Sequence, residues 1–291
     1  MKKSIALCLL LGLLFSGCTT RSATMEEPLQ LTGEQEEVSS ASEMEAFFLS
    51  GGRSVRLGAD IDMGDTMLKL AASRGPVEII GNGHSISASA PCVIRLEDGC
   101  AITLAGVTVL AGQTGIGLLG SGTLTATDTK ISANINAIQA AGSLTLDTAA
   151  GMLTLNAQEG SGISALGISC KQNSTLEITA AVAAISTGRG DLTLHPGAKV
   201  SCSAAGDNVV KTGGTLVLME DSVLETTNTG EHNGARIGAL SADQSATLHV
   251  KGGVNGVGLF VVELYDDVTL KGASVPELKI ETGKGKLTFE T

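Results

Sequence analysis

Gly142-Ser143-Leu144-Thr145-Leu146 shows the pattern that decides the fold of this chain, because variants of it recur along most of the sequence. Apolar residues alternate with threonine or another polar residue, as in a strand with one buried face. Neighbouring copies lie about 20 to 32 residues apart, which is the spacing of a solenoid. The pattern predicts a β-helix, with two or three short strands per coil. Its other copies are residues 101–104, 122–125, 191–194, 214–218, 246–250, 267–270 and 286–289.

The composition agrees with a stack of small aliphatic layers. Of 291 residues, 43% are hydrophobic but only 2% are aromatic, and none is tryptophan. With 38 glycines and 5 prolines, the chain has neither the composition of collagen nor that of a proline-rich disordered protein. The chain carries 19 basic and 30 acidic residues, a formal net charge of −11, which argues against a nucleic-acid partner. We therefore expect a core of Leu, Ile, Val and Ala.

Two early segments resemble a known family. The run from Val77 to Ser87 (VEIIGNGHSIS), followed one coil later by the run from Ala101 to Val109 (AITLAGVTV), resembles the first coils of right-handed parallel β-helices of the pectin-lyase-like superfamily. The resemblance implies an all-β, right-handed parallel β-helix over residues 54–291, with a capping helix before it. A β-sandwich of hairpins is the rival fold, but the Asn-Gly turns typical of hairpins are rare here.

The N-terminus is typical of an export signal. Lys2 and Lys3 precede an apolar run at residues 5–15, which is too short to span a bilayer as a helix. The following Phe15-Ser16-Gly17-Cys18 resembles the lipobox of bacterial lipoproteins. This resemblance implies that residues 1–17 are a signal peptide, that Cys18 is lipidated, and that the lipid holds the chain to a membrane. An ordinary secreted protein is the alternative.

The residue after Cys18 bears on the final location. It is Thr19 rather than aspartate, so the resemblance implies no retention at an inner membrane. We therefore expect an exported protein that is lipid-anchored to the bacterial cell envelope, at an outer membrane or the cell surface.

The segment between the lipobox and the repeats divides into two parts. Residues 18–41 are rich in glutamate and poor in large apolar residues, which predicts a flexible acidic tether. Residues 42–53 are predicted to form a capping helix. Ser42 and Glu45 fit a capping box, and Met44, Phe47 and Phe48 would share one apolar face.

The sequence motifs predict no catalytic, cofactor or metal site. Residues 115–120 match the dinucleotide-binding fingerprint by letter, but a strand pattern follows where that fingerprint needs a helix. Asp266 and Asp267 are adjacent, so they would point to opposite faces of a strand. The histidines, which are dispersed, are His84, His195, His232 and His249.

Four cysteines remain once residues 1–17 and the lipidated Cys18 are set aside. Cys92 and Cys100 flank one strand and its turn, and Cys170 and Cys202 lie about one and a half coils apart. Export permits disulfides within each pair. Cysteine is also a compact core residue that stacks well inside a β-helix. Both interpretations remain open at this point.

These observations favour a non-catalytic, lipid-anchored β-helix protein that presents an extended face for adhesion or assembly. A polysaccharide-active or glycan-binding β-helix is the alternative. Wider repeat spacing at residues 149–170 and 226–245 predicts loop insertions, which are candidate functional surfaces. The last coil ends without a cap, so we expect it to meet a surface partner or a second copy of the chain.

Overall fold

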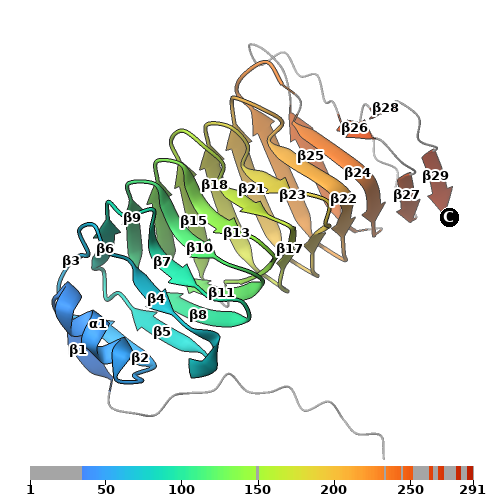
Figure 1. Ribbon diagram of the computed structural model, residues 1–291. Coiled ribbons are helices and arrows are strands. Elements are labelled where there is room, and N and C mark those ends of the chain that lie inside the picture. Colours follow the sequence, from blue (N-terminus) through green and yellow to red (C-terminus); the bar gives the residue numbers. More distant parts are fainter. Residues whose placement is uncertain are drawn as a thin grey trace, which may run out of the picture. The chain divides into compact units, whose positions relative to one another are not determined.

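The computed structural model describes residues 35–148, 151–232, 234–243 and 245–251, and the strands at 262–264, 268–271, 280–282 and 287–290. These residues form a right-handed parallel β-helix with one short α-helix near its N-terminal end, as the sequence predicted (Figure 1). The strand pairings among these residues are all parallel, which excludes the antiparallel hairpins of a β-sandwich.

Each coil contributes strands to three stacks, which we call faces 1, 2 and 3. Thr175 lies opposite Lys199 in the next coil, so one coil takes about 24 residues. Faces 1 and 2 belong to one 20-stranded sheet, because β22 (Val210–Leu218) and β24 (Ala235–Ala242) run continuously from one face to the other. Face 3 is a separate nine-stranded sheet.

The remaining strands are assigned to faces by their pairing. Face 1 contains β4 (Leu68–Leu70), β7 (Cys92–Leu96), β10 (Thr114–Leu118), β13 (Asn136–Ala140), β16 (Ile163–Ala165), β19 (Ile185–Thr187), β26 (Val262–Leu264) and β28 (Ile280–Thr282). Face 2 contains β1 (Glu36–Val38), β2 (Ser54–Leu57), β5 (Val77–Ile80), β8 (Cys100–Ala105), β11 (Gly122–Thr127), β14 (Ser143–Asp147), β17 (Gly167–Cys170), β20 (Leu192–Leu194), β27 (Val268–Lys271) and β29 (Leu287–Glu290). Face 3 contains β3 (Ile61–Asp62), β6 (Ser85–Ala88), β9 (Thr108–Ala111), β12 (Thr129–Ala133), β15 (Met152–Ala157), β18 (Thr175–Ala180), β21 (Lys199–Ala204), β23 (Val223–Asn228) and β25 (Thr247–Lys251).

The core follows the alternation seen in the sequence. In β8, Cys100, Ile102 and Leu104 are buried, and the residues between them are partly exposed. On face 1 the same inward position holds isoleucine in five consecutive coils, and each of these side chains is fully buried: Ile94, Ile116, Ile138, Ile163 and Ile185. Stacked identical side chains fill the interior evenly, so the coils need few aromatic residues.

The N-terminal cap differs from the prediction in its boundaries. The helix α1 spans Ala41–Leu49 and buries Met44, Phe47 and Phe48, as expected. Its N-cap is Ser40, whose Oγ accepts a hydrogen bond from the Glu43 N–H. The capping box predicted at Ser42 and Glu45 is therefore wrong. The sequence Ser40-Ala41-Ser42-Glu43 fits the same rule two residues earlier, and the Glu43 carboxylate accepts from the Ser39 N–H.

The predicted tether, residues 18–41, is also too long at its C-terminal end. Glu36, Glu37 and Val38 form β1 and pair with β2. Val38 is only 1% exposed, and this burial together with the backbone groups of β2 explains why an acidic segment becomes a strand. Residues 18–34 lie outside the described residues. A short 3₁₀ helix, η1 (Ala72–Arg74), connects β4 to β5.

The predicted loop insertions at 149–170 and 226–245 are wrong as well. The first range contains β15, β16 and β17, and the second contains the end of β23 and all of β24. Ser143 lies opposite Gly167 and Val210 lies opposite Ala235, so these coils take 24 and 25 residues, about the length of the other coils. Their sequences depart from the apolar-Thr-apolar pattern, which made ordinary coils look like insertions.

Candidate functional site

The predicted lipidation residue, Cys18, lies outside the described residues, as do Asp266 and Asp267. Within the described part of the chain, the helix α1 has nine residues, and no helix there is both long and apolar enough to cross a bilayer. The fingerprint at residues 115–120 falls on β10 and the turn to β11, so no helix follows it.

All four candidate disulfide cysteines are free and buried in the structure. Cys92 Sγ lies 3.8 Å from Met67 Sδ, and Cys100 Sγ donates to the Leu70 carbonyl oxygen at 3.3 Å. Burial raises the pKa of the Cys170 thiol to about 12, and burial also raises the pKa of Cys202, with a further contribution from Cys170. At neutral pH both groups are protonated, which makes them poor nucleophiles.

The described histidines do not converge. His84 Nδ1 lies 3.5 Å from Asp60 Oδ1, at the turn between β5 and β6. His195 Nε2 is 2.9 Å from Ser169 Oγ on face 2, where both side chains are partly exposed. Within the described ranges, no group of three or more His, Cys, Asp or Glu side chains is placed to hold a metal ion.

A candidate binding surface emerges instead on face 1. Its strands are in register, so their central outward residues form one column along the solenoid. The column, which we call the face-1 strip, comprises Lys69, Arg95, Gly117, Gln139, Ser164, Ser186, Lys211 and Arg236. From β4 to β24 the strip holds basic and neutral residues. The same register then continues to Glu263 on β26 and Glu281 on β28, so acidic residues follow at its C-terminal end.

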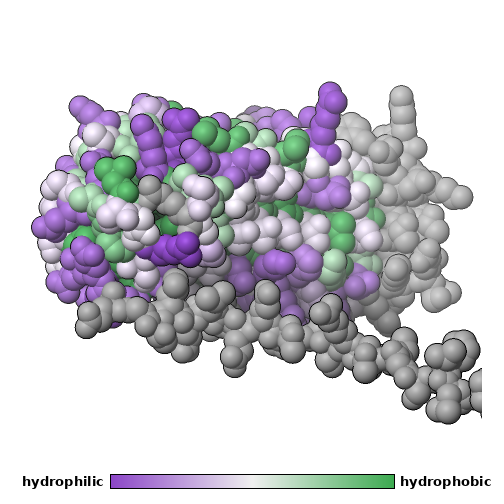
Figure 2. All heavy atoms as spheres, turned by 60° about the horizontal axis from the view of Figure 1, so that its bottom comes forward, coloured by the Kyte–Doolittle hydropathy of each residue, from purple (hydrophilic) through white to green (hydrophobic). Residues whose placement is uncertain are grey.

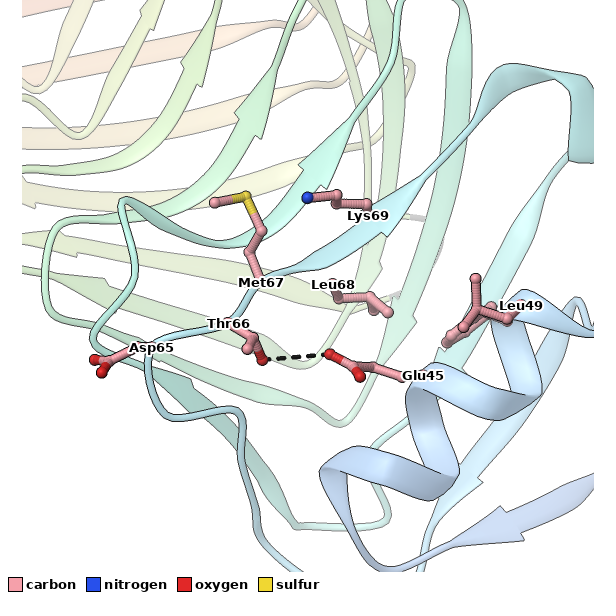
Figure 3. A pocket seen from close by; sticks show the side chains of 8 residues that line it. Glu45, Leu49, Asp65, Thr66, Met67, Leu68 and Lys69 are labelled. Atoms are coloured by element: carbon pink, nitrogen blue, oxygen red, sulfur yellow. Dashed lines mark hydrogen bonds between the residues drawn. The ribbon is translucent and has the colours of Figure 1, made fainter.

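Two hollows adjoin the strip, and Met67 lines both. The first, the cap hollow, lies between α1 and β4, has a volume of about 380 Å³, and is lined by Glu45, Phe48, Leu49 and residues 65–69 (Figure 3). The second, the Gly117 hollow, has a volume of about 480 Å³. Its lining is polar at Arg95, Gln139 and Ser164 and largely apolar elsewhere, at Met67, Pro91, Leu118, Leu119, Ala140 and Ala141.

Around the two hollows, the acidic side chains have hydrogen-bond partners, whereas the basic ones form no ion pair with described residues. Glu45 accepts a hydrogen bond from Thr66 Oγ1 at 3.3 Å (Figure 3), and Asp65 accepts one from Ser89 Oγ at 2.7 Å. Lys69 and Arg95 form no ion pair within the part of the chain that the structure describes. Two neighbouring cations are thus left available to a ligand.

The other end of the strip is electrostatically different. Lys211 Nζ lies 3.3 Å from Asp207 Oδ2. Burial alone would raise the pKa of Asp207, but the Asn208 N–H and the Lys211 ammonium outweigh it, so the pKa is lowered. Lys211 is therefore paired with a carboxylate, in contrast to Lys69 and Arg95 near the N-terminal end of the strip.

Sequence reasoning missed this surface. The column becomes visible only when each face-1 strand is aligned with the next, which places Lys69, Arg95 and Gly117 side by side although they are separated by more than 20 residues in sequence. Comparison of the chain with protein-family models, with curated proteins and with solved structures found no match.

Proposed function

We propose that this protein is a lipid-anchored, non-catalytic β-helix protein of the bacterial cell envelope that presents a lateral face to binding partners. The observation that carries the proposal is the register of the described faces. Because successive coils place their outward residues directly above one another, each face is a continuous array rather than an isolated site. Extended arrays of this kind suit recognition of extended partners.

Face 3 illustrates the array. One outward column of this face passes through seven consecutive strands and is almost entirely hydrophilic. The side of the molecule that comes forward in Figure 2, in which no face is labelled, is likewise covered mostly by hydrophilic and near-neutral residues, with apolar residues in small groups. Such a surface tolerates exposure to water along its length. The column comprises Ser85, Thr108, Lys130, Thr154, Glu177, Ser201 and Glu225.

The anchor rests on the lipobox resemblance at Phe15–Cys18. Mass spectrometry of the N-terminal peptide of the full-length protein, purified from bacterial membranes, tests it. We expect the chain to begin at an acylated Cys18 and to be found in the membrane fraction. A Cys18→Ala variant should leave the membrane fraction. An unmodified N-terminus at another residue would replace this part of the proposal with ordinary secretion.

The non-catalytic part rests on the character of the described side chains. The described thiols are buried, and the described histidines lie apart from one another. For the alternative, a polysaccharide-active or glycan-binding role, aromatic rings would normally supply sugar platforms. Phe47 and Phe48 are the aromatic residues whose side chains the structure describes, and they are 9% and 2% exposed. Incubation with uronic-acid polymers tests the alternative, and release of unsaturated products would establish it.

We also propose that the C-terminal coil meets a partner or a second copy. In the described strands, β29 pairs with β27 and β28 pairs with β26, and no further strand is paired beyond them. Light scattering over a wide concentration range tests self-association. A molar mass that stays that of one chain would leave a separate partner as the occupant of this end.

A further inference from the structure

We propose that the N-terminal half of the face-1 strip is a docking groove for an extended acidic peptide that carries aliphatic side chains. This inference deepens the proposed function, since it names the face and the partner class of a presenting surface. The proposal rests on three features: the cations Lys69 and Arg95, which form no ion pair in the described part of the chain, a hollow beside Gly117, and apolar residues at the edge of that hollow.

The two cations lie on neighbouring strands of face 1. Lys69 on β4 and Arg95 on β7 are direct neighbours in register, so their side chains leave adjacent strands whose backbones are about 4.8 Å apart. Lys69 is exposed and Arg95 is partly exposed. The nearby carboxylates of Glu45 and Asp65 hydrogen-bond to hydroxyl groups instead. Arg95 offers a planar fork of donors that matches a carboxylate.

The hollow beside Arg95 exists because position 117 lacks a side chain. Its neighbours in the strip, Arg95 and Gln139, both carry long side chains. A Cβ built at Gly117 would lie 3.4 Å from Cys92 Sγ, an ordinary contact, and the backbone there has no positive φ. Glycine is therefore not needed for the fold at this position. The missing side chain leaves space between Arg95 and Gln139 in a hollow of about 480 Å³, a volume within the range of ligand pockets.

The lip of the hollow is apolar. Met67 and Leu119 line it, and Leu119 is 53% exposed, which is high for a large aliphatic side chain. Leu166 lies close by, two coils along the same corner, and is 50% exposed. Burying these groups against an aliphatic side chain of a ligand would remove apolar surface from water. A sugar polymer would gain less here, because the described residues that line the Gly117 hollow include no aromatic ring.

The net charge of the whole chain makes the local cations decisive for binding an acidic peptide. At −11 it repels an acidic peptide over most of its surface, so binding must depend on the local cations. An alternating acidic–aliphatic strand would place carboxylates toward Lys69 and Arg95 and alkyl groups toward Met67 and Leu119. Attraction of this kind is screened by salt, so the affinity should fall as the ionic strength rises.

The experiment measures fluorescence anisotropy of a short labelled peptide of alternating Asp and Leu titrated with the full-length protein. A peptide of alternating Lys and Leu is the matched control ligand. We expect binding of the acidic peptide only. Arg95→Glu should weaken it by about tenfold or more, and Lys69→Glu by a smaller factor because its side chain is more exposed. Gly117→Leu should also weaken binding by filling the hollow.

Lys130→Glu is the control variant, because it makes the same change in net charge on face 3. It should alter affinity less than Arg95→Glu. Arg95→Gln removes the charge without reversing it, and circular dichroism confirms that each variant is folded. The proposal is overturned if the acidic peptide does not bind, if the lysine peptide binds equally, or if Lys130→Glu and Arg95→Glu weaken binding alike. Loss of the lipid anchor would not affect this measurement, so the two proposals fail separately.

Discussion

The turns from face 2 to face 3 show how single residues fix the corners of the coils. In six of these turns one residue takes a positive φ between 47° and 70°, a region that favours glycine and the Asx residues. The residues are Asn82, Gly106, Asp128, Asn173, Gly197 and Asp221. The turn chemistry is therefore repeated from coil to coil, even where the sequence of the strands varies.

Gly197 offers a test of this corner. Its φ is +70°, and a Cβ there would overlap the Oδ1 of Asn173 in the preceding coil. We expect Gly197→Ala to lower the free energy of unfolding by about 1–3 kcal/mol, measured by guanidinium denaturation. Gly188→Ala is the control, because its Cβ would meet only Leu166 Cδ1 at 3.8 Å and its φ is not positive. Equal stability of the two variants would contradict the argument.

A thiol-reactivity measurement distinguishes the two interpretations of the cysteines, as disulfide partners or as core residues. If they are core residues, as the structure has them, native protein should show no thiol reactive toward an aromatic disulfide reagent at Cys170 or Cys202, because both are fully buried with raised pKa values. After unfolding in denaturant without reductant, all four should react. Fewer free thiols in the unfolded, unreduced protein would instead indicate disulfides formed during export.

At the scale of elements, the sequence predicted the strands well and their ends less well. The alternation at Ile102, Thr103 and Leu104 follows from the demand that one strand face be buried, and the structure confirms it. It could not show that β22 turns a corner without a break, since this depends on the irregular register between Thr212 and Thr215. The helix was predicted for the right reason, burial of Met44, Phe47 and Phe48, but with the wrong cap.

The N-cap provides the element-scale prediction. Ser40 Oγ accepts from the Glu43 N–H at 3.3 Å, so Ser40→Ala should destabilise the protein by about 1 kcal/mol. Ser42→Ala removes the serine that the sequence pattern favoured, but in the structure that residue lies inside α1. Its Oγ lies 3.2 Å from Ser40 Oγ, but the Glu43 N–H keeps its acceptor when Ser42 is replaced. We therefore expect Ser42→Ala to lower thermal stability less than Ser40→Ala does. If Ser42→Ala were the more damaging variant, the helix would begin later than the structure has it.

At the scale of the whole molecule, the fold could be predicted and the candidate site could not. Repetition of one pattern specifies a solenoid, because each coil buries its aliphatic residues only by stacking on the next. The face-1 strip depends on which residue of one coil lies opposite which residue of another. Coil lengths vary by a few residues, so Arg95 and Gly117 cannot be placed side by side from sequence. The hollow depends on a missing side chain, which no motif records.

Stacking of this kind should also make the effect of a core mutation local. Ile138 is fully buried between Ile116 and Ile163, so Ile138→Ala should cost about 2–5 kcal/mol. Since each coil contacts mainly its two neighbours, hydrogen exchange should accelerate most in β10, β13 and β16 and progressively less toward β4 and β24. Gln139→Ala, the outward neighbour, should leave exchange unchanged. Uniform acceleration along every coil would mean that the β-helix unfolds as one cooperative unit, and that nearest-neighbour stacking does not govern its stability.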